Sequence, residues 1–187
     1  MMKTTPQIPE SIGVLFTDKK QISTALVSSF ILKCLETRIS RVTFYDPWNI
    51  LTFYEHEIYS IVEEKLNEIK LNKKDKYDTN EYIKIYVIGS KDVSSLWEST
   101  TKELCKNNDK PISKNNIKKQ LEKNFVYQID LLIKIGDTPS LCGYPCWVLS
   151  IAEIISVKYF KNKHYISDAE FNNLIMNYTM RDRRQGK

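Results

Sequence analysis

The segment Asp130–Glu153, with the sequence DLLIKIGDTPSLCGYPCWVLSIAE, decides the fold of this 187-residue chain. It opens with a short apolar run that predicts a strand, and an apolar segment returns at Trp147. Between them lies a turn-rich loop with two glycines and two prolines, Gly136, Pro139, Gly143 and Pro145. Ligands of open α/β sheets bind beyond the carboxyl ends of the strands, so a long loop in this place is where a site is expected.

The loop is chemically poor. Its charges are Lys134 and Asp137, and it adds hydroxyls and thiols but no histidine and no arginine. Four cysteines in the chain, without CxxC spacing and with His56 and His164 as the only histidines, make a poor zinc site. Reduced thiols are favoured over a pairing of the two cysteines in the loop.

The strand, the loop, Trp147 and Glu153 resemble the C-terminal signature of the cis-prenyltransferases. In that signature D-L-I-R-T-x-G-E-x-R-x-S-N-F is followed by a tryptophan and then a glutamate. The family's arginine, glutamate, second arginine and serine are replaced here by Lys134, Thr138, Ser140 and Cys142. The resemblance therefore implies a retained scaffold whose diphosphate-binding residues are missing.

The same loop is more similar to one branch of that family, the Nogo-B receptor type, which is the non-catalytic subunit of dehydrodolichyl diphosphate synthase. That branch has K-x-G, a spacer, G-F-x-P-W and then T-E-I. This chain has Lys134, Gly136, the run 143–147 (GYPCW) and the run 152–154 (AEI), with the proline displaced by one position. The pattern S-x-V-x-x-Y-D over 40–46 resembles the same branch.

Residues 12–16 (IGVLF) form a continuous apolar run, which predicts the first, central strand of a parallel sheet. In catalytic relatives, as the resemblance implies, this strand ends in Asp-Gly-Asn, and the aspartate holds Mg²⁺ on the allylic diphosphate. Thr17 stands in its place here. A shift of one residue would give Asp18 that role, but no Gly-Asn and no arginine follow it, and a diphosphate site needs close backbone approach and forked donors.

Further strands are expected over 41–45, 82–88, 129–133 and 151–157, and helices over 23–37, 53–71, 91–106 and 113–123, with a last helix opened by the capping box Ser167–Glu170. Cys34 is predicted to lie in the core. The aromatic residues Trp48, Phe53 and Tyr54 would line a prenyl tunnel or fill a core, and core filling is favoured. Glu153 is expected to be buried and to make a structural hydrogen bond.

Composition predicts one domain, over residues 12–187, behind a polar N-terminal extension over 1–11. No stretch approaches the ~20 apolar residues that span a bilayer, and no signal peptide is visible. The resembled branch commonly carries a membrane segment ahead of this domain, which this sequence lacks. The net charge is +5, and the basic stretches 72–75 and 106–119 are interpreted as solvated surface, with no nucleic-acid partner expected.

The chain ends in Arg184-Gln185-Gly186-Lys187, which resembles the family's C-terminal R-x-G motif. Composition alone would predict a solvated end. The resemblance implies instead that Arg184, Gln185, Gly186 and Lys187 bind isopentenyl diphosphate in a partner's active site, where Arg184 and Gly186 take part in catalysis in trans. A guanidinium offers a planar fork of donors, and glycine lets its N–H approach a phosphate closely.

The sequence thus predicts an α/β domain of cis-prenyltransferase fold, with a central, mostly parallel sheet flanked by helices. As the resemblance implies, it serves as the non-catalytic subunit of a heteromeric dehydrodolichyl diphosphate synthase at the cytosolic face of the endoplasmic reticulum membrane. The partner would hold Mg²⁺ and elongate farnesyl diphosphate with isopentenyl diphosphate, for dolichol synthesis and protein glycosylation. Two alternatives stay open: a self-sufficient homodimeric enzyme that uses Asp18 and Glu153, and a pure interaction or receptor domain.

Overall fold

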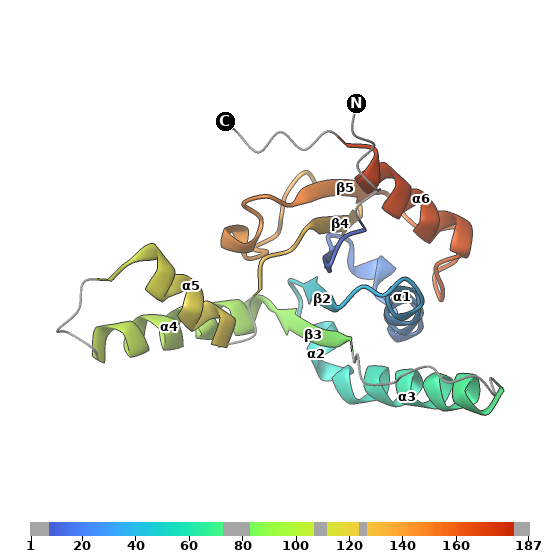
Figure 1. The fold of residues 1–187 in the computed structure, drawn as a ribbon, viewed down its shortest axis with the longest axis horizontal. Coiled ribbons are helices and arrows are strands. Elements are labelled where there is room, and N and C mark those ends of the chain that lie inside the picture. Colours follow the sequence, from blue (N-terminus) through green and yellow to red (C-terminus); the bar gives the residue numbers. More distant parts are fainter. Residues whose placement is uncertain (1–7, 73–82, 107–111, 124–126, 182–187) are drawn as a thin grey trace, which may run out of the picture.

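A parallel sheet forms the centre of the computed structural model, which describes residues 8–72, 83–106, 112–123 and 127–181 (Figure 1). Its strands are β1 (Ser11–Phe16), β2 (Arg41–Asp46), β3 (Lys84–Gly89), β4 (Leu131–Ile135) and β5 (Glu153–Val157). They lie in the order β3-β2-β1-β4-β5, and every pairing is parallel. The expected α/β architecture is confirmed, with β1 as the central strand, buried at all six residues.

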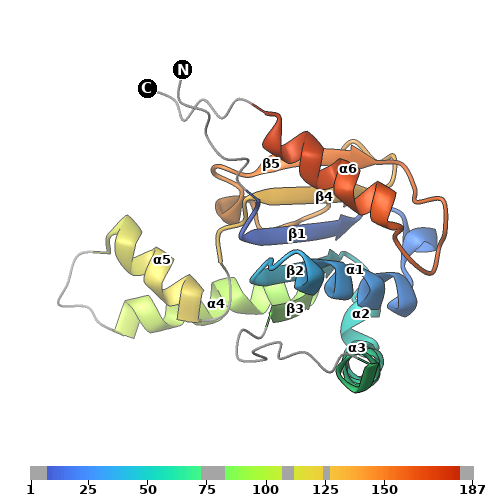
Figure 2. The ribbon, with the colours of Figure 1, turned by 45° about the vertical axis from the view of Figure 1, so that its right-hand side comes forward.

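Helices cover both faces of the sheet (Figure 2). The described helices are α1 (Thr24–Glu36), α2 (Ile50–Phe53), α3 (Glu55–Asn72), α4 (Ser90–Lys106), α5 (Lys114–Lys123) and α6 (Asp168–Thr179), with short 3₁₀ turns at Lys19–Gln21 and Cys146–Val148. One core cluster joins α1, α3 and α6 to one face. A smaller cluster joins α4, α5 and the loop after β4 to the other. None of the described helices is both long and apolar enough to cross a membrane.

Local capping explains why several helices begin where the sequence predicts. The Ser23 hydroxyl accepts a hydrogen bond from the Leu26 N–H and starts α1. The capping box of α6 is complete: the Ser167 hydroxyl accepts from the Glu170 N–H, and the Glu170 carboxylate accepts from the Ser167 N–H. These starts depend on residues three positions apart and are therefore legible in the sequence.

Phe30 of α1 organises the larger core cluster. Its ring makes edge contacts with Phe44, Phe160 and Phe171, at centroid distances of 6.4, 5.7 and 5.9 Å. These rings come from α1, β2, the segment after β5 and α6, so one side chain ties four parts of the chain together. Cys34, one turn further along α1, is fully buried as predicted, and burial raises the pKa of its thiol.

The segment after β2 corrects two predictions. The single helix expected over 53–71 is two helices, α2 and α3, which are separated at Tyr54. The buried carboxylate of Asp46 starts α2 early, because it accepts hydrogen bonds from the N–H groups of Trp48, Ile50 and Leu51.

The three aromatic residues expected to fill the core lie at the surface instead. Trp48 and Tyr54 are each 41% exposed, and Phe53 is 81% exposed. The core beneath them is filled by Leu51 and Ile58, both fully buried. The aliphatic stripe of α2 and α3 therefore turns inward and the aromatic rings turn out.

Replacing Phe30 by alanine is expected to lower the free energy of unfolding by about 3–5 kcal/mol, because it removes a large, fully buried ring. Phe53→Ala removes the same atoms from an exposed site, and the expected change is below about 0.5 kcal/mol. Urea unfolding followed by circular dichroism measures both. Equal losses in the two variants would contradict this account of the core.

Candidate functional site

The loop predicted to carry the site meets the end of the central strand. Phe16 at the end of β1 pairs with Ile135 at the end of β4, so Thr17 and Gly136 leave the sheet side by side. The structure thus brings together Thr17, Asp18 and the loop after β4, as the sequence predicts. The geometry of their contact decides what this edge of the sheet can bind.

Thr17 joins the two chain segments through three hydrogen bonds. Its N–H and its hydroxyl both donate to the Ile135 carbonyl, at 2.7 and 3.0 Å. The Thr138 hydroxyl donates to the Thr17 carbonyl at 3.0 Å. Thr17 is buried, so its side chain serves the structure of the edge and does not reach out to a ligand.

Gly136 shows how closely the two segments approach. Its backbone has φ +117°, a conformation that L side chains rarely adopt, and a Cβ atom there would lie 2.5 Å from Thr17 Oγ1 and 3.0 Å from the Asp18 nitrogen. A methyl group does not fit between the two segments. A diphosphate, which is larger, has no room at this point of contact.

The charged groups of this edge are held by their own chain. Lys134 Nζ donates to the Thr138 carbonyl at 2.7 Å. The Asp18 carboxylate accepts the Lys20 N–H at 2.9 Å and caps the turn that follows β1. Asp137 forms an exposed ion pair with Lys158 at 2.8 Å. Each of these charges has a local structural partner.

The donor set at this edge does not fit Mg²⁺. Magnesium takes oxygen ligands in octahedral geometry, and proteins bind it through one or two carboxylates together with substrate phosphates. In the described ranges no group of three or more histidine, cysteine, aspartate or glutamate side chains is placed to hold a metal ion. Asp18 is oriented by its own turn, and the position of the family's metal-binding aspartate is occupied by Thr17.

The middle of the loop is packed against the sheet by two tyrosines. Tyr45 at the end of β2 donates its hydroxyl to the Cys142 carbonyl at 2.8 Å, and its ring lies 5.4 Å from that of Tyr144. Burial raises the pKa of both phenols, so both stay neutral. The sequence showed Tyr45 as part of a strand but gave no sign of this contact, which joins residues 97 positions apart.

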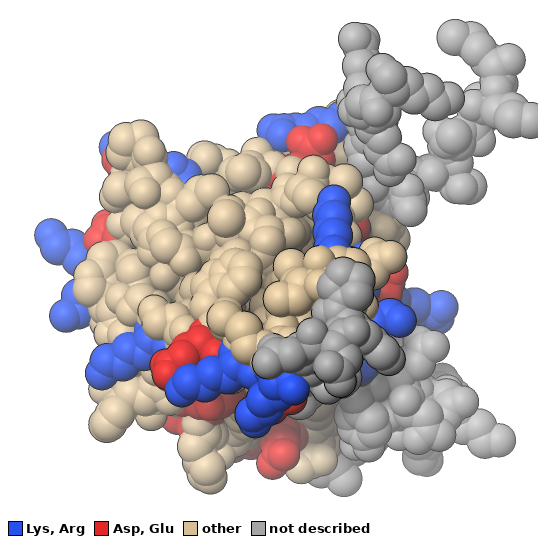
Figure 3. Space-filling model, turned by 90° about the vertical axis from the view of Figure 1, so that its left-hand side faces the viewer, with Lys and Arg blue, Asp and Glu red and all other residues tan. Residues whose placement is uncertain are grey.

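Trp147 anchors the far end of the loop. Its ring lies 4.4 Å from that of Trp97 on α4, and its indole nitrogen is buried without a hydrogen-bond partner. Figure 3 views the molecule from the side of α4 and α5 and shows a largely uncharged surface above a band of mixed charges. The loop is thus a packed structural element on this side of the sheet.

Glu153 makes the structural hydrogen bond that the sequence predicts, but it is partly exposed and not buried. Its carboxylate accepts a hydrogen bond from the Arg181 guanidinium at 2.7 Å, and the same nitrogen donates to the Ile154 carbonyl at 3.2 Å. Arg181 follows α6, so this ion pair ties the end of the last helix to the start of β5. Arg184, Gln185, Gly186 and Lys187 lie outside the described residues, and their role stays a prediction.

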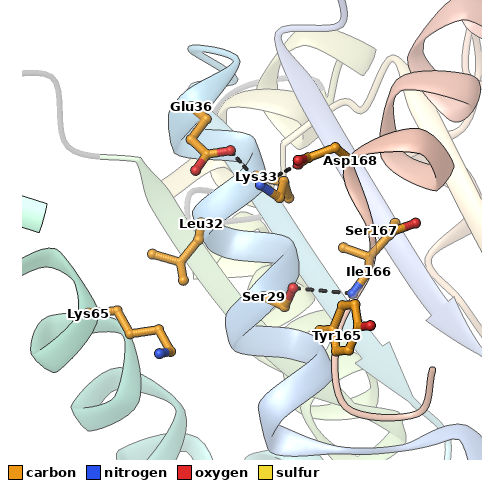
Figure 4. A pocket seen from close by; sticks show the side chains of 9 residues that line it. All are labelled: Ser29, Leu32, Lys33, Glu36, Lys65, Tyr165, Ile166, Ser167 and Asp168. Atoms are coloured by element: carbon orange, nitrogen blue, oxygen red, sulfur yellow. Dashed lines mark hydrogen bonds and ion pairs between the residues drawn. The ribbon is translucent and has the colours of Figure 1, made fainter.

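A shallow pocket of about 440 Å³ lies apart from this edge, between α1, α3 and the start of α6 (Figure 4). Lys33 ion-pairs there with Glu36 at 2.7 Å and with Asp168 at 2.6 Å. The Ser29 hydroxyl accepts the Ile166 N–H. Because these polar groups are already paired with one another, the pocket offers little to an external ligand.

Comparison with known proteins identifies the fold. No protein-family model matches the sequence, and no curated protein is similar to it. A probable undecaprenyl diphosphate synthase from Campylobacter jejuni matches with a TM-score of 0.58 and 15% identity, covering 97% of this chain and 100% of that one. Lavandulyl diphosphate synthase from Lavandula x intermedia, solved in complex with dimethylallyl diphosphate, matches with a TM-score of 0.60 and 12% identity, covering 94% and 97%. The chain has the fold of the cis-prenyltransferases.

Gly136→Ala is expected to lower the free energy of unfolding by about 1–3 kcal/mol, because alanine is strained at a positive φ and its methyl group would collide with Thr17. Asp137→Ala is the neighbouring control. It removes an exposed ion pair and should change stability by less than about 1 kcal/mol. Thermal unfolding of both variants measures the difference, and an unchanged Gly136→Ala would mean that the two segments are not in tight contact.

Proposed function

We propose that this chain is the non-catalytic, active-site-completing subunit of a heteromeric cis-prenyltransferase of the dehydrodolichyl diphosphate synthase type. The observation that carries the proposal is the closed contact between Thr17 and the 135–138 segment. As the resemblance implies, a catalytic member holds Mg²⁺ and the allylic diphosphate at the aspartate that Thr17 replaces. This edge supports the scaffold and supplies no such site.

Opening this edge for a diphosphate would be costly. The hydrogen bonds between Thr17 and the loop contribute on the order of 1 kcal/mol each, and the buried groups left unpaired would add a desolvation penalty. The ammonium of Lys134 would also have to leave the Thr138 carbonyl. A working site would need forked guanidinium donors that this loop does not contain.

The partner in this proposal is a catalytic cis-prenyltransferase chain. It supplies the metal-binding aspartate and the prenyl tunnel, and it adds isopentenyl diphosphate units to farnesyl diphosphate. The product would feed dolichol synthesis and protein glycosylation at the cytosolic face of the endoplasmic reticulum membrane. Membrane association comes from the complex or from an N-terminal segment that precedes this sequence.

This chain contributes its C-terminal residues to the partner's site. Arg184 donates two parallel hydrogen bonds to diphosphate oxygens, and Gly186 brings its N–H close to the same ligand. Gln185 and Lys187 add a polar and a charged donor. The match to the R-x-G motif supports this assignment, together with the scaffold's lack of a diphosphate site of its own.

The test is isopentenyl transfer to farnesyl diphosphate by this chain, by the catalytic cis-prenyltransferase chain of the same organism, and by their mixture. Full activity is expected only in the mixture. Arg184→Ala should lower it about tenfold or more, since a hydrogen bond to a charged group contributes roughly 1.5–3 kcal/mol and 1.36 kcal/mol is tenfold in rate. Gly186→Ala should also reduce it, while Arg183→Ala, outside the motif, should leave it unchanged.

Two results would redirect the proposal. Activity from this chain alone would identify a self-sufficient enzyme and make Asp18 the next residue to replace. Unchanged activity of the mixture after deletion of 185–187 would identify a pure interaction domain. Both alternatives are therefore decided by the same set of assays.

A further inference from the structure

The outer face of α6 has no charged side chain beyond its first turn. Phe171, Leu174 and Tyr178 point into the core, and the residues on the opposite side are asparagines and methionines: Asn172, Asn173, Met176, Asn177 and Met180. Met176 is 55% exposed and Met180 is 77% exposed. Charged residues make up 27% of the chain, so their absence from this helical face is notable. Depletion of charge and enrichment in methionine are features of protein–protein interfaces.

The neighbouring strand β5 has an open edge. In the described part of the chain the sheet order leaves no strand on its outer side. The Glu153 N–H donates to the Asp130 carbonyl and the Val157 carbonyl accepts from Gly136, so these residues face β4. By the alternation of a parallel ladder, Ile154 and Ser156 present their backbone groups outward. Their side chains are uncharged, and proteins rarely leave such an edge uncovered.

Arg181 connects the two features. Its guanidinium binds the Glu153 carboxylate and, on the open edge of β5, the Ile154 carbonyl. Met180 precedes it in the chain, and Figures 1 and 2 both place α6 next to β5. The exposed side chains of Ile151, Ile154, Met176 and Met180, with the Arg181–Glu153 ion pair, are here named the β5–α6 surface.

We propose that the β5–α6 surface is where the catalytic subunit, a second chain of the same fold, docks. This inference rests on the function proposed above and assigns that partner its place on this chain. The surface offers an uncharged helix face and a strand edge, which suit an apolar face and an unpaired strand on the partner.

The end of the described chain selects this occupant. Arg181 is fixed on β5, and six residues follow it. Six residues span at most about 20 Å when fully extended. The R-x-G motif can therefore act in a partner's site only if that partner lies against the part of this chain from which the tail departs. A partner seated on α3, or at the tip of the α4–α5 hairpin, would lie on other sides of the molecule (Figure 1).

The experiment measures complex formation apart from activity. The full chain and the catalytic chain are mixed and analysed by size-exclusion chromatography with light scattering, and affinity is measured by titration. The double variant Met176→Glu/Met180→Glu should weaken binding at least a hundredfold. Phe53→Glu, which places the same charge on an equally exposed apolar residue elsewhere, should bind as the original chain does.

A second variant guards against a folding defect. Ile154→Lys charges the strand side of the surface and should weaken binding by at least tenfold, with circular dichroism and thermal unfolding unchanged in all variants. Replacement of both methionines by leucine should preserve binding, because it keeps the apolar face.

The outcomes separate this inference from the proposed function. Binding that the double glutamate variant retains overturns the β5–α6 surface, even if the mixture is active. A complex that forms through this surface but does not transfer isopentenyl groups contradicts the proposed function alone. If the variants disrupt self-association of this chain while the catalytic chain does not bind, the assigned partner is wrong.

Discussion

The Ile135 carbonyl, which accepts both the N–H and the hydroxyl of Thr17, holds together the part of the molecule on which its function depends. It joins the ends of β1 and β4, the two strands at the centre of the sheet. Gly136 allows this contact because it has no Cβ atom and adopts a positive φ. In an open parallel sheet the carboxyl ends of such strands are where ligands bind. Here that place is taken up by hydrogen bonds within the chain.

Closure of this edge gives the surroundings a structural role as well. The loop that follows β4 is fastened by Tyr45 and Tyr144 near its middle and by the contact between Trp97 and Trp147 at its end. Side chains that would form the walls of a site thus form a second, smaller core. What the molecule leaves unsatisfied lies elsewhere, on the open edge of the sheet and the uncharged face of α6. A subunit with a filled site and an uncovered flank is suited to assist another chain.

Much of the fold could be predicted because its signals are local. Continuous apolar runs predicted the strands of a sheet buried on both faces, and serine caps predicted where α1 and α6 begin. The aromatic residues Trp48 and Phe53 were misjudged, because aromatic side chains near a helix usually fill a core. Their exposure follows from Asp46, whose buried carboxylate directs the chain into α2, and no pattern of neighbouring residues announces that contact.

The sequence by itself determined the elements, the parallel sheet and the resemblance to cis-prenyltransferases, since each depends on residues within a few positions of one another. It also showed which catalytic residue types are absent from the loop. Only the tertiary structure decided how the edge of the sheet closes and where Glu153 finds its partner. Thr17 and Ile135 lie 118 positions apart, and Glu153 and Arg181 lie 28 apart. Contacts over such separations form only when the whole sheet and its helices are packed, so spacing along the chain does not reveal them.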